Sequence, residues 1–205
     1  MPYEVGGRAD KQGNKYEFNW IILKFIDIIS EKIDAIKIEP IGPEGECVDV
    51  LVRYKNGSTE AQQCKGRNAS KESWSLADLN QKGILKSWKR HLERDPKIKV
   101  SLVSPLSFTS FSDLIYRAKT NDEAQSFIKY QVDTSPEVRK LLNNYIDYLE
   151  FSKERDIQKI INFLSRTVIR QEPYPDNEEF IKDKVSQYFI GDATSIKSKF
   201  INLIL

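Results

Sequence analysis

Apolar side chains recur at helical spacing near the N-terminus of the chain. In residues 16–33, "YEFNWIILKFIDIISEKI", the apolar positions include Trp20, Leu23, Ile26 and Ile29, three to four residues apart. This period matches one face of an α-helix. We therefore predict a long, largely buried first helix over residues 16–33.

Short extended runs replace this pattern after residue 34. The runs are "AIKIEPI" (35–41), "CVDVLVRY" (47–54) and "STEAQQCK" (58–65), separated by turns that contain Gly or Pro. Such runs are typical of strands in an antiparallel meander. A second helix is predicted over residues 76–94, where Ser75 and Asp78 have capping-box spacing, and "KIKVSLVSP" (97–105) predicts a fourth strand.

The second half of the chain is mainly helical in pattern. We predict helices over 111–119, 122–130, 136–151, 156–165, 177–189 and 194–205, with one further strand in "RTVIRQEP" (166–173). The order of helix, three strands, helix and strand predicts an α/β fold, a mixed sheet flanked by helices on both faces. Residues 1–107 are predicted to form the core and residues 108–205 a helical C-terminal extension packed on it. The apolar end "KFINLIL" (199–205) indicates either a fragment of a longer protein or a last helix packed on the core.

Composition narrows the class of protein only a little. The 205 residues are 40% hydrophobic and 30% charged, as in ordinary globular proteins, and the net charge of +2 does not decide whether nucleic acid is bound. Cys47 and Cys64 both fall in predicted buried strands, which indicates reduced thiols in a cytoplasmic protein. No run reaches the roughly 18 apolar residues of a membrane span, so we expect no membrane partner. The single histidine, His91, and the lack of a CxxC pair argue against a structural zinc site and a Ser-His-Asp triad.

The hairpin around Asn56-Gly57 carries the candidate chemistry, and its register decides which side chains share a face. A two-residue loop would pair Asp49 with Cys64 and scatter the polar groups. A three-residue loop over 55–57, with Gly57 in the left-handed conformation, would instead place Asp49 opposite Gln63. We favour the three-residue loop, which pairs Tyr54 with Ser58 and points Val48, Val50, Val52 and Cys64 into the core.

In this register a carboxylate, an amide and an ammonium group converge at the end of the hairpin. Asp49 and Gln63 could hold Mg²⁺ through oxygen atoms, while Lys65 orients or helps to deprotonate an attacking water. The backbone carbonyl of Cys64 is a further candidate ligand, and Glu17 on the first helix is the candidate second carboxylate. The alternative is a solvated hairpin face without chemistry, which is common for such residues.

Three segments together resemble a known superfamily: "GGRADKQGNKYEFNW" (6–20), "CVDVLV" (47–52) and "EAQQCKGR" (60–67). They resemble the restriction-endonuclease-like PD-(D/E)xK superfamily in its Asp…Gln-x-Lys variant. The resemblance is closest to the double-stranded-DNA nuclease domains fused to bacterial antiphage sensors, those of cyclic-oligonucleotide signalling and of STAND NTPase systems. Its specific part covers residues 6 to 70.

The resemblance implies roles for individual residues. Asp49 would be the first metal carboxylate, Gln63 the ligand that is more often Glu, Lys65 the catalytic lysine and Glu17 the helix carboxylate. It further implies a restriction-endonuclease-like core over residues 1–107 and Mg²⁺-dependent hydrolysis of DNA phosphodiesters, with Mn²⁺ as a substitute. Cleavage would be controlled by self-association or by a fused or associated sensor. The alternative function is a non-catalytic DNA-binding or protein-interaction module on the same fold.

Polar residues around the hairpin are candidates for phosphate contacts, since cationic and amide side chains position a nucleic-acid backbone. The candidates are Arg8, Lys11, Lys15, Arg67, Asn68 and Lys71. An ordinary solvated surface is the alternative for each, and Lys82, Lys86, Lys89 and Arg90 on the second helix either line a cleft or face water. Trp74 and Trp88 are predicted to be core or domain-contact residues and not base-stacking platforms. His91 is predicted to be a partly exposed helix residue.

Overall fold

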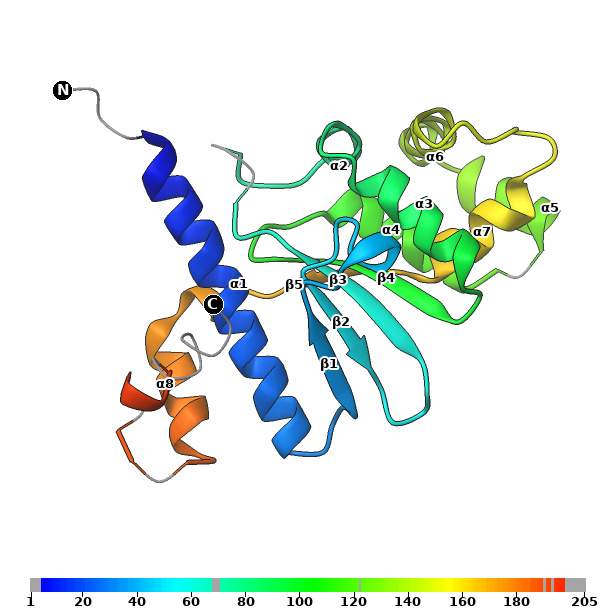
Figure 1. The fold of residues 1–205 in the computed structure, drawn as a ribbon. Coiled ribbons are helices and arrows are strands. Elements are labelled where there is room, and N and C mark those ends of the chain that lie inside the picture. The colour runs from blue at the N-terminus through cyan, green and yellow to red at the C-terminus, as the bar shows by residue number, and fades with distance from the viewer. Residues whose placement is uncertain (1–4, 68–70, 122, 190, 193, 198–205) are drawn as a thin grey trace.

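The computed structural model describes residues 5–67, 71–121, 123–189, 191–192 and 194–197, with the side chains of residues 5–14 outside this description. Its centre is a five-stranded sheet in the order β1-β2-β3-β4-β5 (Figure 1). The strands are β1 (Ala35–Ile38), β2 (Val50–Arg53), β3 (Thr59–Cys64), β4 (Ile98–Ser104) and β5 (Thr167–Gln171). β1, β2 and β3 pair antiparallel, whereas β4 pairs parallel with both β3 and β5. The predicted α/β class with a mixed sheet flanked by helices is confirmed.

The first helix, α1 (Val5–Ile29), begins and ends earlier than the predicted 16–33. Its buried turns, which include Tyr16 and Trp20, pack on the sheet, and a helix that has formed extends at little further cost even through residues with low propensity. Ile33, predicted as helical, follows the helix end and still contributes to the core.

The predicted helix over 76–94 is two helices, α2 (Leu76–Gln81) and α3 (Ile84–Arg94). The break falls at Gly83, whose φ of +73° is accessible to glycine at no steric cost. The capping box is confirmed, since the hydroxyl of Ser75 accepts from the Asp78 amide while the Asp78 carboxylate accepts from the Ser75 amide.

The second half supplies both helices and β5, so residues 108–205 contribute a strand to the same sheet. The helices are α4 (Thr109–Lys119), α5 (Ala124–Ser126), α6 (Pro136–Tyr148), α7 (Ile157–Ser165) and α8 (Glu178–Ser186), with the shorter helical turns η2 (Phe127–Val132) and η3 (Tyr174–Asp176). A further turn, η1 (Gly42–Glu44), lies in the first half, between β1 and β2. The helix predicted over 122–130 is instead the short α5 followed by the π-helical η2, whose wider turn places Phe127 and Val132 both in the core. Residues 194–197 are helical, while the rest of the last predicted helix and the apolar end 199–205 lie outside the described residues.

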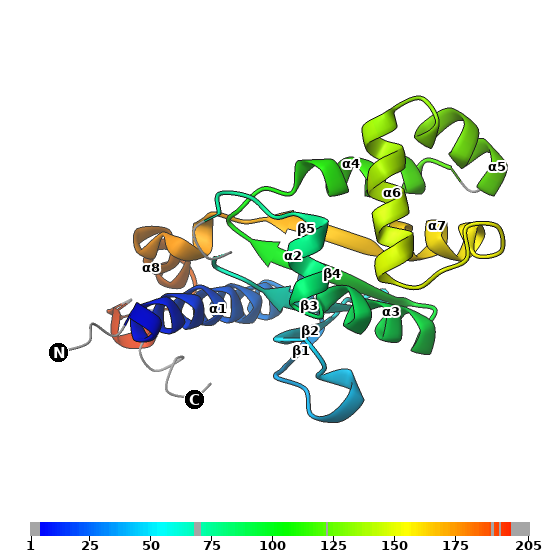
Figure 2. The same ribbon diagram turned by 90° about the horizontal axis from the view of Figure 1, so that it is seen from above.

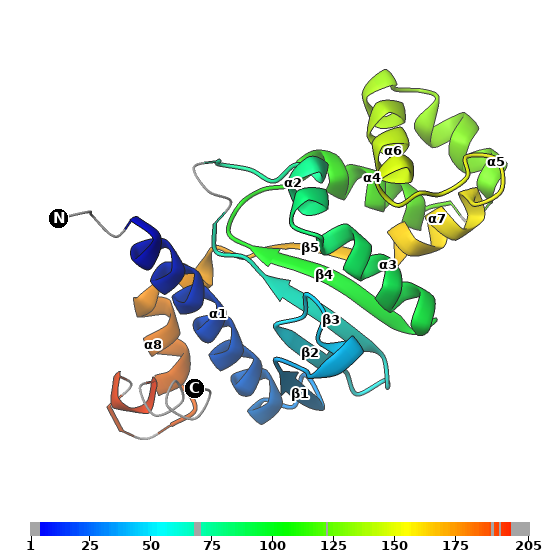
Figure 3. The same ribbon diagram turned by 45° about the horizontal axis from the view of Figure 1, so that its top comes forward.

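Two apolar clusters fill the two sides of the sheet. The larger joins the sheet to α2, α3, α4, α6 and α7 and contains Trp74 and Trp88, which are both buried as predicted. The smaller joins α1 to Val50, Val52, Cys64 and Val103 of the strands. Figures 2 and 3 show α8 beside α1 at one end of the molecule and α4–α7 at the other.

Glu60 is a buried carboxylate that ties β3 to β5. It is 1% exposed and accepts hydrogen bonds from Arg170 at 2.7 and 2.8 Å and from the Tyr54 hydroxyl at 2.7 Å. Burial alone would raise its pKa, but the hydrogen bonds and charge of Arg170 and the bond from Tyr54 lower the pKa of Glu60 to about 2. This pair fastens the two halves of the sheet on the side that carries α1.

Candidate metal site at the end of the β2–β3 hairpin

The register of the β2–β3 hairpin is the one predicted from the three-residue loop. The amide of Tyr54 donates to the carbonyl of Ser58 at 2.9 Å, and Gly57 has a φ of +78°. The ladder runs from the Arg53–Thr59 pair to the Val50–Gln62 pair. The regular ladder ends at that pair: the Asp49 amide donates to the Gln62 carbonyl at 2.9 Å, and Asp49 meets Gln63 through their side chains.

The Asp49 carboxylate is the point at which three consecutive residues of the hairpin meet. Its Oδ2 atom accepts from Nε2 of Gln63 at 2.7 Å and from the backbone amide of Cys64 at 2.6 Å. The ammonium group of Lys65 lies 3.9 Å from the same oxygen. The structure therefore brings together Asp49, Gln63, Cys64 and Lys65.

Asp49 lies just before β2, and the chain around it is less regular than a strand. Cys47, predicted in a buried strand, is half-buried in the preceding loop with a φ of +50°, because the backbone turns sharply there. Val48 was predicted on the same side as Val50, but its side chain joins the opposite cluster with α2 and α3. The side-chain alternation of a strand thus begins only at Val50.

Glu17 reaches the same site from α1. Burial first, then the charge of Asp49, and more weakly that of Glu39, raise the pKa of Glu17 to about 7, while Lys65 opposes the rise. Burial also raises the pKa of Asp49 against the opposing effects of Lys65 and the bonds from Cys64 and Gln63. Two carboxylates thus lie near one lysine, in surroundings that disfavour their negative charge.

This donor set fits a hard divalent cation with few acidic ligands. No three His, Cys, Asp or Glu side chains in the described ranges are grouped so that they could hold a metal. The two carboxylates would need neutral oxygen donors beside them, and the Cys64 carbonyl and the Gln63 amide are such donors. Because Nε2 of Gln63 faces Asp49, Oε1 is the atom of Gln63 that would bind the cation.

The candidate phosphate-binding residues are only partly free for that role. Lys15 pairs with Glu178 at 2.9 Å, and Lys71 pairs with Asp78. Arg67 is exposed. Burial raises the pKa of Asp176, and the charges of Arg67 and Lys15 oppose this rise. Arg8 and Lys11 lie on α1 with their side chains outside the description, and Asn68 is outside the described residues.

Three basic residues of α3, Lys86, Lys89 and Arg90, contact neighbouring segments of the chain. Lys86 lies 3.7 Å from Glu150, and Lys89 donates to the carbonyl of Leu149 at 2.7 Å, both at the end of α6. The prediction that His91 is partly exposed is wrong. His91 is 2% exposed, because α3 packs against the β1–β2 loop and the ring hydrogen-bonds to the Glu46 carbonyl there. No pattern in the sequence pointed to this loop contact.

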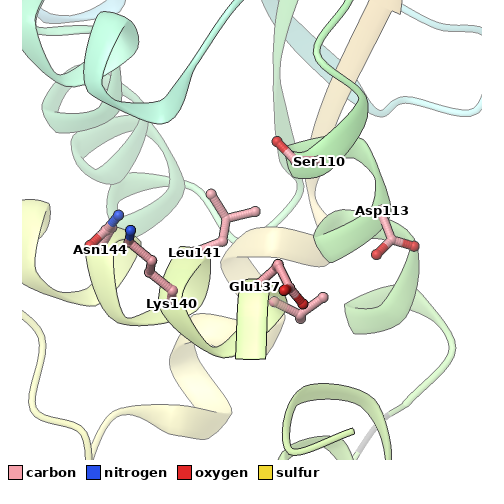
Figure 4. Close-up of a pocket in the computed structure, with 7 residues that line it drawn as sticks. Ser110, Asp113, Glu137, Lys140, Leu141 and Asn144 are labelled. Carbon is pink, nitrogen blue, oxygen red and sulfur yellow. The ribbon is translucent and has the colours of Figure 1, made fainter. Parts of the chain in front are cut away.

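A separate hollow of about 390 Å³ lies between α4 and α6 (Figure 4). Its walls include Ser110, Asp113, Glu137, Leu141 and Asn144. The Asp113 carboxylate accepts from Arg117 at 2.7 Å. None of the residues lining this hollow belongs to the Asp49 site.

Comparisons with known proteins reveal similarity in fold. No protein-family model matches the chain, and no curated protein matches it. The Acinetobacter baumannii Cap4 SAVED/CARF-domain containing receptor matches with a TM-score of 0.53 and 15% identity, over 94% of this chain and 42% of the receptor. The structure of the same receptor with the cyclic trinucleotide 3'3'3'-cAAA matches with a TM-score of 0.53 and 15% identity, over 94% of this chain and 40% of the receptor.

The Moraxella osloensis Cap4 SAVED/CARF-domain containing receptor matches with a TM-score of 0.51 and 16% identity, over 94% of this chain and 42% of that one. The chain thus spans about two fifths of the length of the receptors it matches. Within the described ranges, no helix is both long enough and apolar enough to cross a membrane.

Proposed function

We propose that the protein is a Mg²⁺-dependent endonuclease that hydrolyses phosphodiester bonds of double-stranded DNA. The observation that carries this proposal is the convergence of Gln63, Cys64 and Lys65 on Asp49, with Glu17 close by. Burial first, and then the charge of Asp49, raise the pKa of Glu17 to about 7. A bound divalent cation would offset this crowding of negative charge. The donor types match those that Mg²⁺ prefers, and Mn²⁺ is expected to substitute.

Each residue has a part in the proposed reaction. Asp49 and Glu17 supply carboxylate oxygens, and Gln63 and the Cys64 carbonyl supply neutral ones. Bound Mg²⁺ would polarise the phosphodiester and lower the pKa of a bound water. Lys65 is held beside Asp49, where its ammonium group can orient the attacking water or stabilise charge on the phosphate.

We further propose that the nuclease is an effector of bacterial antiphage defence, activated by self-association or by a fused or associated sensor. Two observations support this setting. The segments around the site resemble nuclease domains fused to sensors of cyclic oligonucleotides, and the fold resembles part of a receptor seen with a cyclic trinucleotide. In this proposal the chain corresponds to the effector part of such a protein.

A second candidate function is a non-catalytic binding module on the same fold. The observation that favours it is Gln63, which brings no charge to the site and leaves the described residues without a group of three acidic ligands. Such a module would bind DNA, a protein or a cyclic oligonucleotide without cutting.

The experiment is plasmid cleavage over a wide range of protein concentration, with Mg²⁺ or Mn²⁺ and with EDTA. Lys65→Ala is compared with Lys55→Ala, which removes an exposed lysine paired with Glu31 at the opposite end of the same hairpin. We expect cleavage by wild-type protein and Lys55→Ala, and its loss in EDTA and in Lys65→Ala. Cleavage that survives Lys65→Ala would contradict the assigned chemistry.

A second arm adds the cyclic trinucleotide 3'3'3'-cAAA and measures binding by calorimetry. The effector proposal expects no binding to this chain alone. Binding without cleavage at any protein concentration would favour the non-catalytic module.

A further inference from the structure

The loop between β1 and β2, residues 39–49, is tightly folded and strained. Glu39 and Cys47 have φ values of +40° and +50°, which non-glycine residues rarely adopt. A Cβ atom on Gly45 would lie 1.5 Å from the Pro40 carbonyl oxygen, so the loop closes on itself where only glycine fits. Such conformations persist only where neighbouring structure holds them.

Helix α3 provides that hold through one residue of the loop, Glu46. The Glu46 carbonyl accepts from the Ser87 hydroxyl and pairs with Nε2 of His91 at 2.9 Å. The Glu46 carboxylate forms an ion pair with Arg90. Positions 87, 90 and 91 share one side of a helix. We call these three contacts the Glu46 clamp.

The tautomer of His91 follows from its two partners. Arg94 approaches Nδ1 of His91 at 3.0 Å, and a guanidinium group can only donate, so Nδ1 accepts. Nε2 then carries the hydrogen and donates to the Glu46 carbonyl. Burial first, and then the charges of Arg94 and Arg90, lower the pKa of His91 and keep the ring neutral, whereas its bond to Glu46 opposes this.

The clamp lies three residues before Asp49. Between them, Cys47 carries the left-handed backbone and Val48 is 5% exposed in the core. The Asp49 amide donates to the Gln62 carbonyl at 2.9 Å, which fastens the other end of this short path. A release at Glu46 would let the strained backbone relax and move the Asp49 side chain, while the sheet beyond Val50 stays in place.

We propose that the Glu46 clamp fixes the position of the Asp49 carboxylate, which makes His91 a positioning residue of the candidate metal site. This role rests on the metal-dependent function proposed above. It predicts a defect in metal binding from a substitution on α3, a helix that contributes no ligand.

The test compares His91→Leu with His91→Gln. His91→Leu removes the hydrogen-bond donor and fills the buried position with an apolar side chain, whereas His91→Gln retains an N–H donor. Leu92→Ala is the matched control, because Leu92 is equally buried on α3, at 2% exposed, and makes no contact in the clamp. Ser87→Ala replaces His91→Leu if that variant does not fold. Two quantities are measured: amide hydrogen exchange of residues 42–49, and Mn²⁺ affinity by calorimetry.

We expect His91→Leu to speed exchange in the loop and to weaken Mn²⁺ binding, each by about tenfold or more, and His91→Gln to restore both toward wild type. Leu92→Ala should lower the melting temperature and leave loop exchange and Mn²⁺ affinity unchanged. If His91→Leu only lowers the melting temperature, as Leu92→Ala does, the positioning role is refuted. Wild-type protein that binds no Mn²⁺ would contradict the proposed function. Amide exchange of residues 42–49 would then show by itself whether the Glu46 clamp holds the loop.

Discussion

Replacing Glu17 by glutamine tests whether two carboxylates crowd each other at the site. The variant keeps the size and shape of the side chain and removes its charge. The pKa of Glu17 is raised from 4.5 to about 7 in the folded protein. A difference of this size corresponds to about 3 kcal/mol, and solvent screening of a partly exposed carboxylate reduces it to about 1–2 kcal/mol.

The sign follows from proton binding. Because the folded-state pKa is the higher one, the folded protein binds more protons between pH 4.5 and 7, and wild-type stability falls as the pH rises through this window. Glu17→Gln should therefore match wild type near pH 4 and be more stable by about 1–2 kcal/mol at pH 8. For a chain of this length the gain corresponds to roughly 2–8 °C in melting temperature.

The assay is thermal or urea unfolding at pH 4, 6 and 8, first in EDTA and then in Mg²⁺. Glu179→Gln, which removes an exposed carboxylate, is the control and should show no comparable pH-dependent gain. Adding Mg²⁺ at pH 8 should stabilise wild type more than Glu17→Gln, since only wild type offers both carboxylates. A Glu17→Gln variant that is less stable than wild type at pH 8 in EDTA would show that the Glu17 charge does not destabilise the folded protein.

Four further predictions concern Asp49, Glu60 and Gly45. Asp49→Asn should abolish calorimetric Mn²⁺ binding, and unchanged affinity would remove Asp49 from the ligands. Glu60→Gln should lower the free energy of unfolding by about 3 kcal/mol near pH 7, because it leaves Arg170 without its buried partner. Chemical denaturation measures this free energy, and a loss below about 1 kcal/mol would contradict the prediction. Since the folded pKa of Glu60 is lowered to about 2, its contribution should be present above pH 4.5 and disappear as the pH falls toward 2, which unfolding at pH 2, 4 and 6 would show; a flat profile would contradict it. Gly45→Ala should disrupt the β1–β2 loop, visible as faster amide exchange there, and protection equal to wild type would contradict the close approach to Pro40.

The sequence predicted those features that depend on local chemistry. The Asn-Gly turn and the strand pattern sufficed for the hairpin register as far as the Val50–Gln62 pair, beyond which the Asp49 and Gln63 side chains meet. Ser75 and Asp78 likewise marked the start of α2 by their spacing. In these cases the determining contacts join residues no more than 14 positions apart.

The sequence did not predict contacts between distant segments. The Arg170–Glu60 pair and the Lys15–Glu178 pair join residues more than one hundred positions apart, and nothing local marks either one. His91 was predicted to be partly exposed because its partner, Glu46, lies in a loop whose folded path depends on a strained backbone. Tertiary contacts decided these positions against local expectation.

The most direct test of the account locates the metal. Crystals grown with Mn²⁺ would give an anomalous-difference map, in which bound Mn²⁺ appears as a peak. We expect a peak held by the Asp49 carboxylate and Oε1 of Gln63, with Glu17 beside it. A map with no peak there at saturating Mn²⁺, or with a peak only on other residues, would contradict the metal site and the nuclease chemistry that depends on it.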